Sequence, residues 1–213
     1  MTDRSTRRIA RGLRMRLRSW GQSGRLVHLH EIAGVSEISR RYLPMNAFDG
    51  VLMALGIITG SYFAGARDIP TVISVVAAAS VSLGVSGFYG SYLSEQAERS
   101  RELQDLEEAT LHDLNETDIG AAFRYAILAV ATVAGLSSML GGLLPCVGLA
   151  FYPIVGANTA FGLAWVVAVA ELFLLGAFLS HVSHGRLLVS AAKLILAGGV
   201  AFGLSLLLNA PNA

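Results

Sequence analysis

The feature that most constrains the fold of this chain is a series of five apolar runs, each about 20 residues long. About 20 helical residues are needed to cross the roughly 30 Å hydrocarbon core of a bilayer. The runs do not alternate apolar with polar residues, so they predict helices rather than the strands of a barrel. We therefore expect an all-α polytopic membrane protein with spans at about 45–64, 71–93, 120–144, 159–182 and 187–208.

The distribution of charge indicates an orientation for these spans. Charged residues make up 15% of the 213 residues, against about 25% in soluble domains, and the mean hydropathy is +0.57. Ten of the sixteen basic residues lie between Arg4 and Arg41, before the first run. Because basic flanks remain in the cytoplasm, we predict a cytoplasmic N-terminus and, after five crossings, a C-terminus outside.

Two regions are expected: a basic cytoplasmic segment over residues 1–43 and a five-helix membrane domain over residues 44–213. Residues 6–17 predict a basic amphipathic helix on an anionic membrane surface, with a flexible basic tail as the alternative. No cleavable signal pattern follows them. We expect an integral multi-pass protein that contacts the lipid bilayer, in the plasma membrane if the organism is prokaryotic, with no nucleic-acid partner.

Asp49 is the most informative charged residue, because it stands at the mouth of the first apolar run, in the sequence Asn46-Ala-Phe-Asp49-Gly50. A carboxylate beside hydrocarbon is costly unless it is solvated, paired or used, and such residues line ion pathways. Glu171, in the middle of the fourth run, is expected either to accept a proton or to pair with a neighbouring helix. The predicted transport path consists of Asn46, Asp49, Ser86, Ser91 and Glu171.

The polar insert at residues 95–118 predicts a short acidic helix that continues the second span into the cytoplasm. Its Glu98 and Glu102 are four residues apart and share a face. Clustered carboxylates suit Fe²⁺, Mn²⁺ or Ca²⁺, and the possible donors in this insert are Glu95, Glu98, Glu102 and Glu116, with Asp105 and His112. The alternative, favoured by spacing alone, is a solvated helix with internal ion pairs such as Glu95–Arg99 and Glu98–Arg101.

Small residues recur on one face of the second span, at Gly84, Gly87 and Gly90. Such a face lets helices approach closely. It predicts tight packing, either within the subunit or across a dimer.

Several motifs resemble the vacuolar iron transporter family. Residues 49–60, Asp-Gly-Val-Leu-Met-Ala-Leu-Gly-Ile-Ile-Thr-Gly, resemble its first-helix signature. Residues 86–98 are similar to the end of its second helix, which runs into an acidic cytoplasmic helix, and Gly141-Gly142-Leu-Leu-Pro145 is similar to the end of its third. The resemblance covers about residues 40–210.

The resemblance implies a homodimer of five-helix subunits that exports Fe²⁺, and often Mn²⁺, from the cytoplasm in exchange for protons. The metal would be a transported substrate and not a permanent cofactor. Asp49 would bind metal and protons on the path, and Glu95, Glu98 and Glu102 would capture metal on the cytoplasmic side.

Two departures from the family pattern bear on this function. The insert between the second and third spans has only about 20 residues, where the better-known members carry a longer three-helix metal-binding module. The family usually carries Met and Glu where this chain has Gly87 and Ser91. This favours the alternative of a non-transporting or differently selective membrane scaffold. No nucleophile, phosphate loop or closed metal motif is present, so catalytic residues, and hence an enzyme, are not expected.

Overall fold

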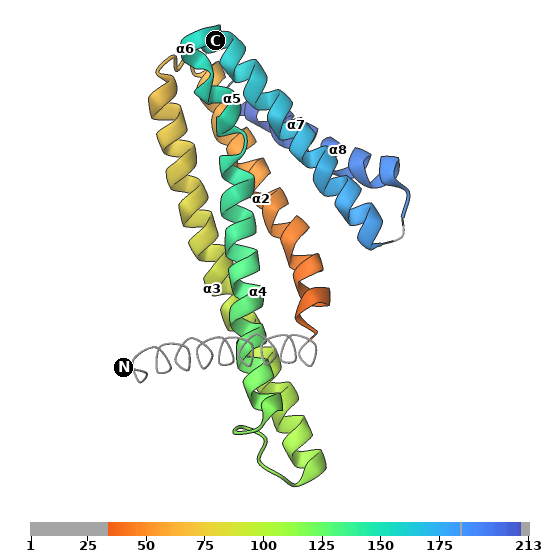
Figure 1. Cartoon of the computed structure of the whole chain (residues 1–213). Coiled ribbons are helices and arrows are strands. Elements are labelled where there is room, and N and C mark those ends of the chain that lie inside the picture. The colour runs from red at the N-terminus through yellow and green to blue at the C-terminus, as the bar shows by residue number, and fades with distance from the viewer. Residues whose placement is uncertain (1–33, 184, 210–213) are drawn as a thin grey trace, which may run out of the picture.

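The computed structural model describes residues 34–183 and 185–209, and every regular element in this part of the chain is a helix (Figure 1). The expected basic helix at residues 6–17 lies outside the described residues. Five of the helical segments are long and apolar enough to span a membrane, which confirms the all-α class and the number of spans. The helices are α2 (Val35–Phe63), α3 (Ile69–Thr110), α4 (Asp118–Leu143), α5 (Cys146–Ala150), α6 (Tyr152–Val155), α7 (Ala157–Val182) and α8 (Leu187–Asn209).

The first helix begins about ten residues before its apolar run. Helix α2 starts at Val35 and includes Pro44 in its interior. The residues ahead of the run include Glu37, Arg40 and Arg41, which are good helix formers although they are polar. Hydropathy therefore locates the part of α2 that contacts hydrocarbon and misses its polar first turns.

Helix α3 is a single element of 42 residues, about 63 Å long at 1.5 Å per residue. That length is about twice the hydrocarbon thickness of a bilayer. The apolar run fills its first half, and the acidic insert forms its second half. The prediction that the second span continues as a polar helix is confirmed as far as Thr110. The rest of the insert, residues 111–117, forms a loop instead of helix, beginning at Leu111 in a left-handed conformation.

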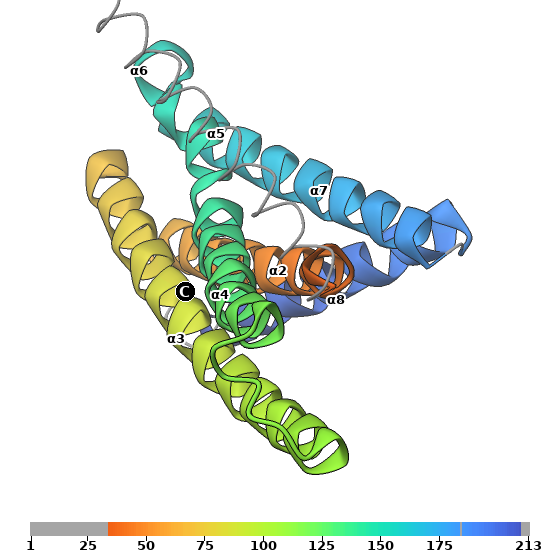
Figure 2. The same ribbon diagram turned by 60° about the horizontal axis from the view of Figure 1, so that its bottom comes forward.

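Helices α2, α3 and α4 form one closely packed group, whereas α7 and α8 form a hairpin that packs mainly on α2 and diverges from α3 (Figures 1 and 2). Helix α8 runs antiparallel to α7, because Gly176 lies against Ala191 and Trp165 contacts the Phe202 ring. The short helices α5 and α6 connect α4 to α7. Pro145 and Pro153 account for this broken connection, since proline cannot donate a backbone hydrogen bond inside a helix.

Glycine makes the contact between α2 and α4 close. A Cβ at Gly50 would overlap the Ser138 carbonyl oxygen, and one at Gly141 would overlap the Ala47 carbonyl oxygen. Small residues at helix interfaces allow backbones to approach in this way in membranes. The α2–α4 contact fixes the rotation of α2 and so determines which of its polar residues face outward.

The glycine face predicted on α3 serves mainly the interior of the subunit. Gly84 lies against Met139 and the Gly135 carbonyl oxygen, both on α4. A Cβ at Gly87 would lie 3.0 Å from Ser138 Oγ, whereas Gly90 faces open space. The sequence left open whether this face packs within the subunit or across a dimer. Gly84 and Gly87 pack within the subunit.

Candidate functional site

Asp49 lies on the outer surface of α2, with an exposed side chain. The next residue, Gly50, is buried against α4, and successive helical residues point about 100° apart. Among the described residues, no hydrogen bond or ion pair reaches the Asp49 carboxylate. The acid at the mouth of the first span therefore has no partner in the part of the chain that the structure describes.

Asn46 lies one turn before Asp49 and turns toward the junction of α2, α3 and α4. Its Nδ2 donates to the Tyr42 carbonyl oxygen at 2.8 Å, and its Oδ1 accepts a hydrogen bond from Ser138 Oγ at 3.3 Å. A Cβ at Gly87 would lie 3.4 Å from the same Oδ1. The Asn46–Ser138 pair therefore places two polar atoms beside Gly87 of α3. A larger residue at position 87 would displace this pair.

The two path serines of α3 lie on different faces of the helix. Ser91 is buried and Ser86 is exposed. Ser86 points away from Gly84, which is buried against α4. The structure therefore brings Asn46 and Ser138 together beside Gly87, and it leaves Ser86 outside this junction.

The acidic half of α3 is organised around a basic residue, Arg99. The Arg99 Nε lies 3.7 Å from Glu95 Oε2, and its Nη1 donates to Glu102 Oε2 at 3.2 Å. The guanidinium also covers the Phe123 ring of α4, 5.0 Å from the ring centroid. The expected Glu95–Arg99 pair is confirmed, and Arg99 also pairs with Glu102. The expected Glu98–Arg101 pair does not form among the described residues.

Other groups enclose Glu95, which is only 8% exposed. Tyr42 of α2 lies near its carboxylate. Glu98, by contrast, is exposed on α3. Within residues 34–183 and 185–209, no group of three or more His, Cys, Asp or Glu side chains is close enough to hold a metal ion.

Glu171 occupies a separate place, in the middle of α7. Its side chain is 9% exposed, and Oε2 has no hydrogen-bond partner among the described residues. Neighbouring residues on the same face of α7, Ala168 and Leu172, pack against Val51 and Leu55 of α2. Glu171 was expected either to accept a proton or to pair with a neighbouring helix. The described residues provide no such partner for its Oε2.

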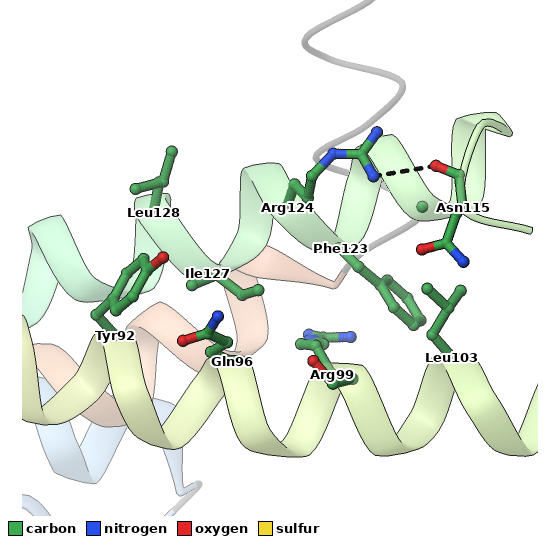
Figure 3. A pocket seen from close by; sticks show the side chains of 11 residues that line it. Tyr92, Gln96, Arg99, Leu103, Asn115, Phe123, Arg124, Ile127 and Leu128 are labelled. Atoms are coloured by element: carbon green, nitrogen blue, oxygen red, sulfur yellow. Dashed lines mark hydrogen bonds between the residues drawn. The ribbon is translucent and has the colours of Figure 1, made fainter.

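A pocket of about 350 Å³, which the sequence does not predict, lies between α3 and α4 (Figure 3). It lies where both helices pass from apolar to polar sequence. Arg124 reaches across its rim, and its Nη1 donates to the Asn115 carbonyl oxygen at 3.0 Å. The sequence signal for this pocket was the single arginine near the start of the third span, beside the polar insert.

The loop beyond this pocket is ordered by local hydrogen bonds. Asp113 Oδ1 accepts the Asn115 backbone N–H at 2.9 Å. This bond, with a second from the Asn115 side chain, holds the pKa of Asp113 below its usual value. The loop therefore presents a carboxylate beside, and not inside, the pocket.

The fold defines a multi-pass α-helical membrane protein, in which three closely packed helices are joined to a diverging hairpin. The chain is similar to the uncharacterized protein MJ0645 of Methanocaldococcus jannaschii, with 27% identity over 168 residues, which cover 78% of this chain and 85% of that protein. No family model and no solved structure matches the chain.

Proposed function

We propose that this protein moves a divalent metal ion, Fe²⁺ or Mn²⁺, across the membrane in exchange for protons. The observation that carries the proposal is the unpartnered Asp49 carboxylate on the outer surface of α2. An ionised group at the edge of hydrocarbon is expensive unless a cation, water or another subunit satisfies it. A transported cation explains why the acid is retained at this position.

A single carboxylate supplies too few ligands for such an ion, which takes several oxygen or nitrogen donors. Asn46, one turn away, directs its amide oxygen to Ser138 Oγ instead. We propose that a second copy of the chain covers this face, so that Asp49 lines a path between two subunits and water completes the coordination shell. The outward direction of Asp49 supports this arrangement.

We assign proton binding to Glu171. A neutral carboxylic acid costs far less to bury than a carboxylate. The burial of Glu171 and the absence of a partner at Oε2 among the described residues support a group that holds a proton. Glu171 lies on α7 and Asp49 on α2, so the proton and the metal ion would bind carboxylates on two different helices.

A second candidate is a membrane scaffold that does not transport. The pairing of Glu95 and Glu102 with Arg99 favours this function, since it occupies two carboxylates that metal capture would need. Gly87 and Ser91 favour it as well, because neither supplies the thioether or carboxylate of the family pattern.

Metal flux into proteoliposomes under a pH gradient separates these functions. We expect the wild type to carry Fe²⁺ or Mn²⁺ and Asp49→Asn to reduce the flux about tenfold or more, since hydrogen bonds and contacts to a charged group are worth roughly 1.5–3 kcal/mol. The matched control is Asp105→Asn, which removes the same charge from an exposed position of α3. A wild type that moves neither ion, or equal flux in the two variants, would contradict the proposal.

A further inference from the structure

The groove between α3 and α4 continues beyond the pocket of Figure 3. A second pocket, of about 240 Å³ and almost wholly apolar, lies on the same side of the two helices, lined by Val81, Val85 and Tyr89 of α3 and by Thr132, Leu136 and Met139 of α4. Tyr92 and Leu128 line the first pocket. Tyr92 lies about one helical turn after Tyr89 on α3, and Leu128 lies about one turn before Thr132 on α4. The two pockets are therefore adjacent along the same groove.

Along the groove, the first pocket is partly polar and the second is apolar. The first presents polar groups of Gln96, Ser100 and Arg124 at the level where α3 becomes charged. The second lies within the apolar half of α3. From Val81 to Tyr92 the groove follows eleven residues, about 16 Å at 1.5 Å per residue, close to half of the roughly 30 Å hydrocarbon core.

Charge favours an anion in the first pocket. Arg124 is exposed and donates one N–H to a carbonyl oxygen, and a guanidinium carries five N–H donors. Arg99 forms the floor, where its charge is compensated by Glu95 and Glu102. No carboxylate residue lines the pocket, because the acids at 95, 98 and 102 share a stripe of α3 that differs from the stripe of Tyr92, Gln96 and Ser100.

We propose that the α3–α4 groove binds one anionic phospholipid, with its phosphate at Arg124, Gln96 and Ser100 and an acyl chain along Val85 and Leu136. Basic pockets between transmembrane helices at the membrane surface bind anionic head groups. The polar end, the apolar continuation and the length of one leaflet together fit a phospholipid better than a free anion, which would use only the first pocket. This site is separate from Asp49 and Glu171 and does not depend on metal transport.

Native mass spectrometry of the detergent-purified full chain, with added phosphatidylglycerol or phosphatidylcholine, tests the head-group end. We expect preferential retention of phosphatidylglycerol and about fivefold weaker binding in Arg124→Gln, since one basic residue contributes roughly a factor of five to attraction by anionic lipid. The matched control is Arg101→Gln, an exposed arginine of α3 that does not line the pocket. Equal binding of the two lipids, or an equal loss in both variants, would overturn the proposal.

The apolar end is tested by Val85→Trp, which fills the groove from an exposed position, with Val75→Trp as the control on another face of α3. Circular dichroism and gel filtration verify that each variant folds. We expect Val85→Trp to weaken retention of phosphatidylglycerol and Val75→Trp to leave it unchanged. Unchanged retention in Val85→Trp would show a headgroup or free-phosphate site alone. A lipid-independent change from dimer to monomer in that variant would show that a second copy occupies the groove. Either result would overturn the phospholipid assignment.

Discussion

Trp165 of α7 donates its indole N–H to the hydroxyl of Thr59 on α2, with 3.2 Å between Nε1 and Oγ1. Thr59 is fully buried, so this bond joins the hairpin to the three-helix group in the interior of the protein. The edge of the Trp165 ring also meets Tyr62 and Phe202. One side chain therefore connects α2, α7 and α8.

The Trp165–Thr59 bond should contribute a measurable coupling energy. We expect a double-mutant cycle of Trp165→Phe and Thr59→Val to give about 0.6 kcal/mol, the average for hydrogen bonds between transmembrane helices. Denaturant unfolding in mixed micelles measures the four free energies. A coupling energy of zero would show that the bond adds no stability beyond the packing of its two side chains.

The close approach of α2 and α4 should make Gly141 intolerant of a methyl group. Gly141→Ala places a Cβ against the Ala47 carbonyl oxygen, and such overpacking costs about 1–3 kcal/mol. The control is Gly56→Ala, on α2 with nothing within 4 Å, where alanine should stabilise the helix by about 0.5–1 kcal/mol. Opposite shifts of the thermal midpoint are expected. Equal shifts would contradict the close contact.

Removal of Arg99 should destabilise the fold more than removal of either pairing residue. Arg99→Gln leaves Glu95 buried without its cation, which costs about 3–5 kcal/mol for a fully buried pair. Glu102→Gln should cost less than about 1 kcal/mol, because the Glu102 side chain is 50% exposed. The double variant Arg99→Gln with Glu95→Gln should recover part of the loss. Equal unfolding free energies for Arg99→Gln and Glu102→Gln would refute this ranking.

Glu171 should carry the response to protons and not the metal path itself. We expect Glu171→Gln to retain downhill metal flux in proteoliposomes and to lose its stimulation by a pH gradient, since glutamine keeps the shape and cannot be protonated in this range. Dicyclohexylcarbodiimide, which attacks protonated carboxyls in apolar surroundings, should label Glu171 in the wild type, as peptide mapping would show. A variant that still responds to the gradient would exclude Glu171 as the proton carrier.

Much of the architecture was predictable because the bilayer imposes it. Run length and the need to satisfy backbone hydrogen bonds leave helices as the solution, and the five spans follow from them. The polar insert predicted the extension of α3 beyond the apolar run but not its end at Thr110, since the helix was expected to continue to residue 118. The early start of α2 at Val35 was not predictable from hydropathy, since Glu37 and Arg40 are polar and yet favour a helix.

The directions of the candidate side chains were less predictable, because they depend on the rotation of each helix. That rotation is set by contacts such as Gly50 on Ser138, which no local pattern of α2 reveals. The contacts of Arg99 were likewise only partly predictable. Its pair with Glu95 follows from four-residue spacing, whereas its contact with Phe123 joins two helices that are distant in sequence.

The uninterrupted course of α3 has a mechanical consequence. The helix has no proline or glycine between Gly90 and Thr110, so nothing in its sequence forms a hinge where it leaves the apolar layer. A partner that displaces the end of α3 near Thr110 would therefore tilt the whole helix about its contact with α4. Gly84 lies in that contact. A force applied to α3 outside the bilayer would therefore be transmitted to the junction of α2, α3 and α4 beside Asn46.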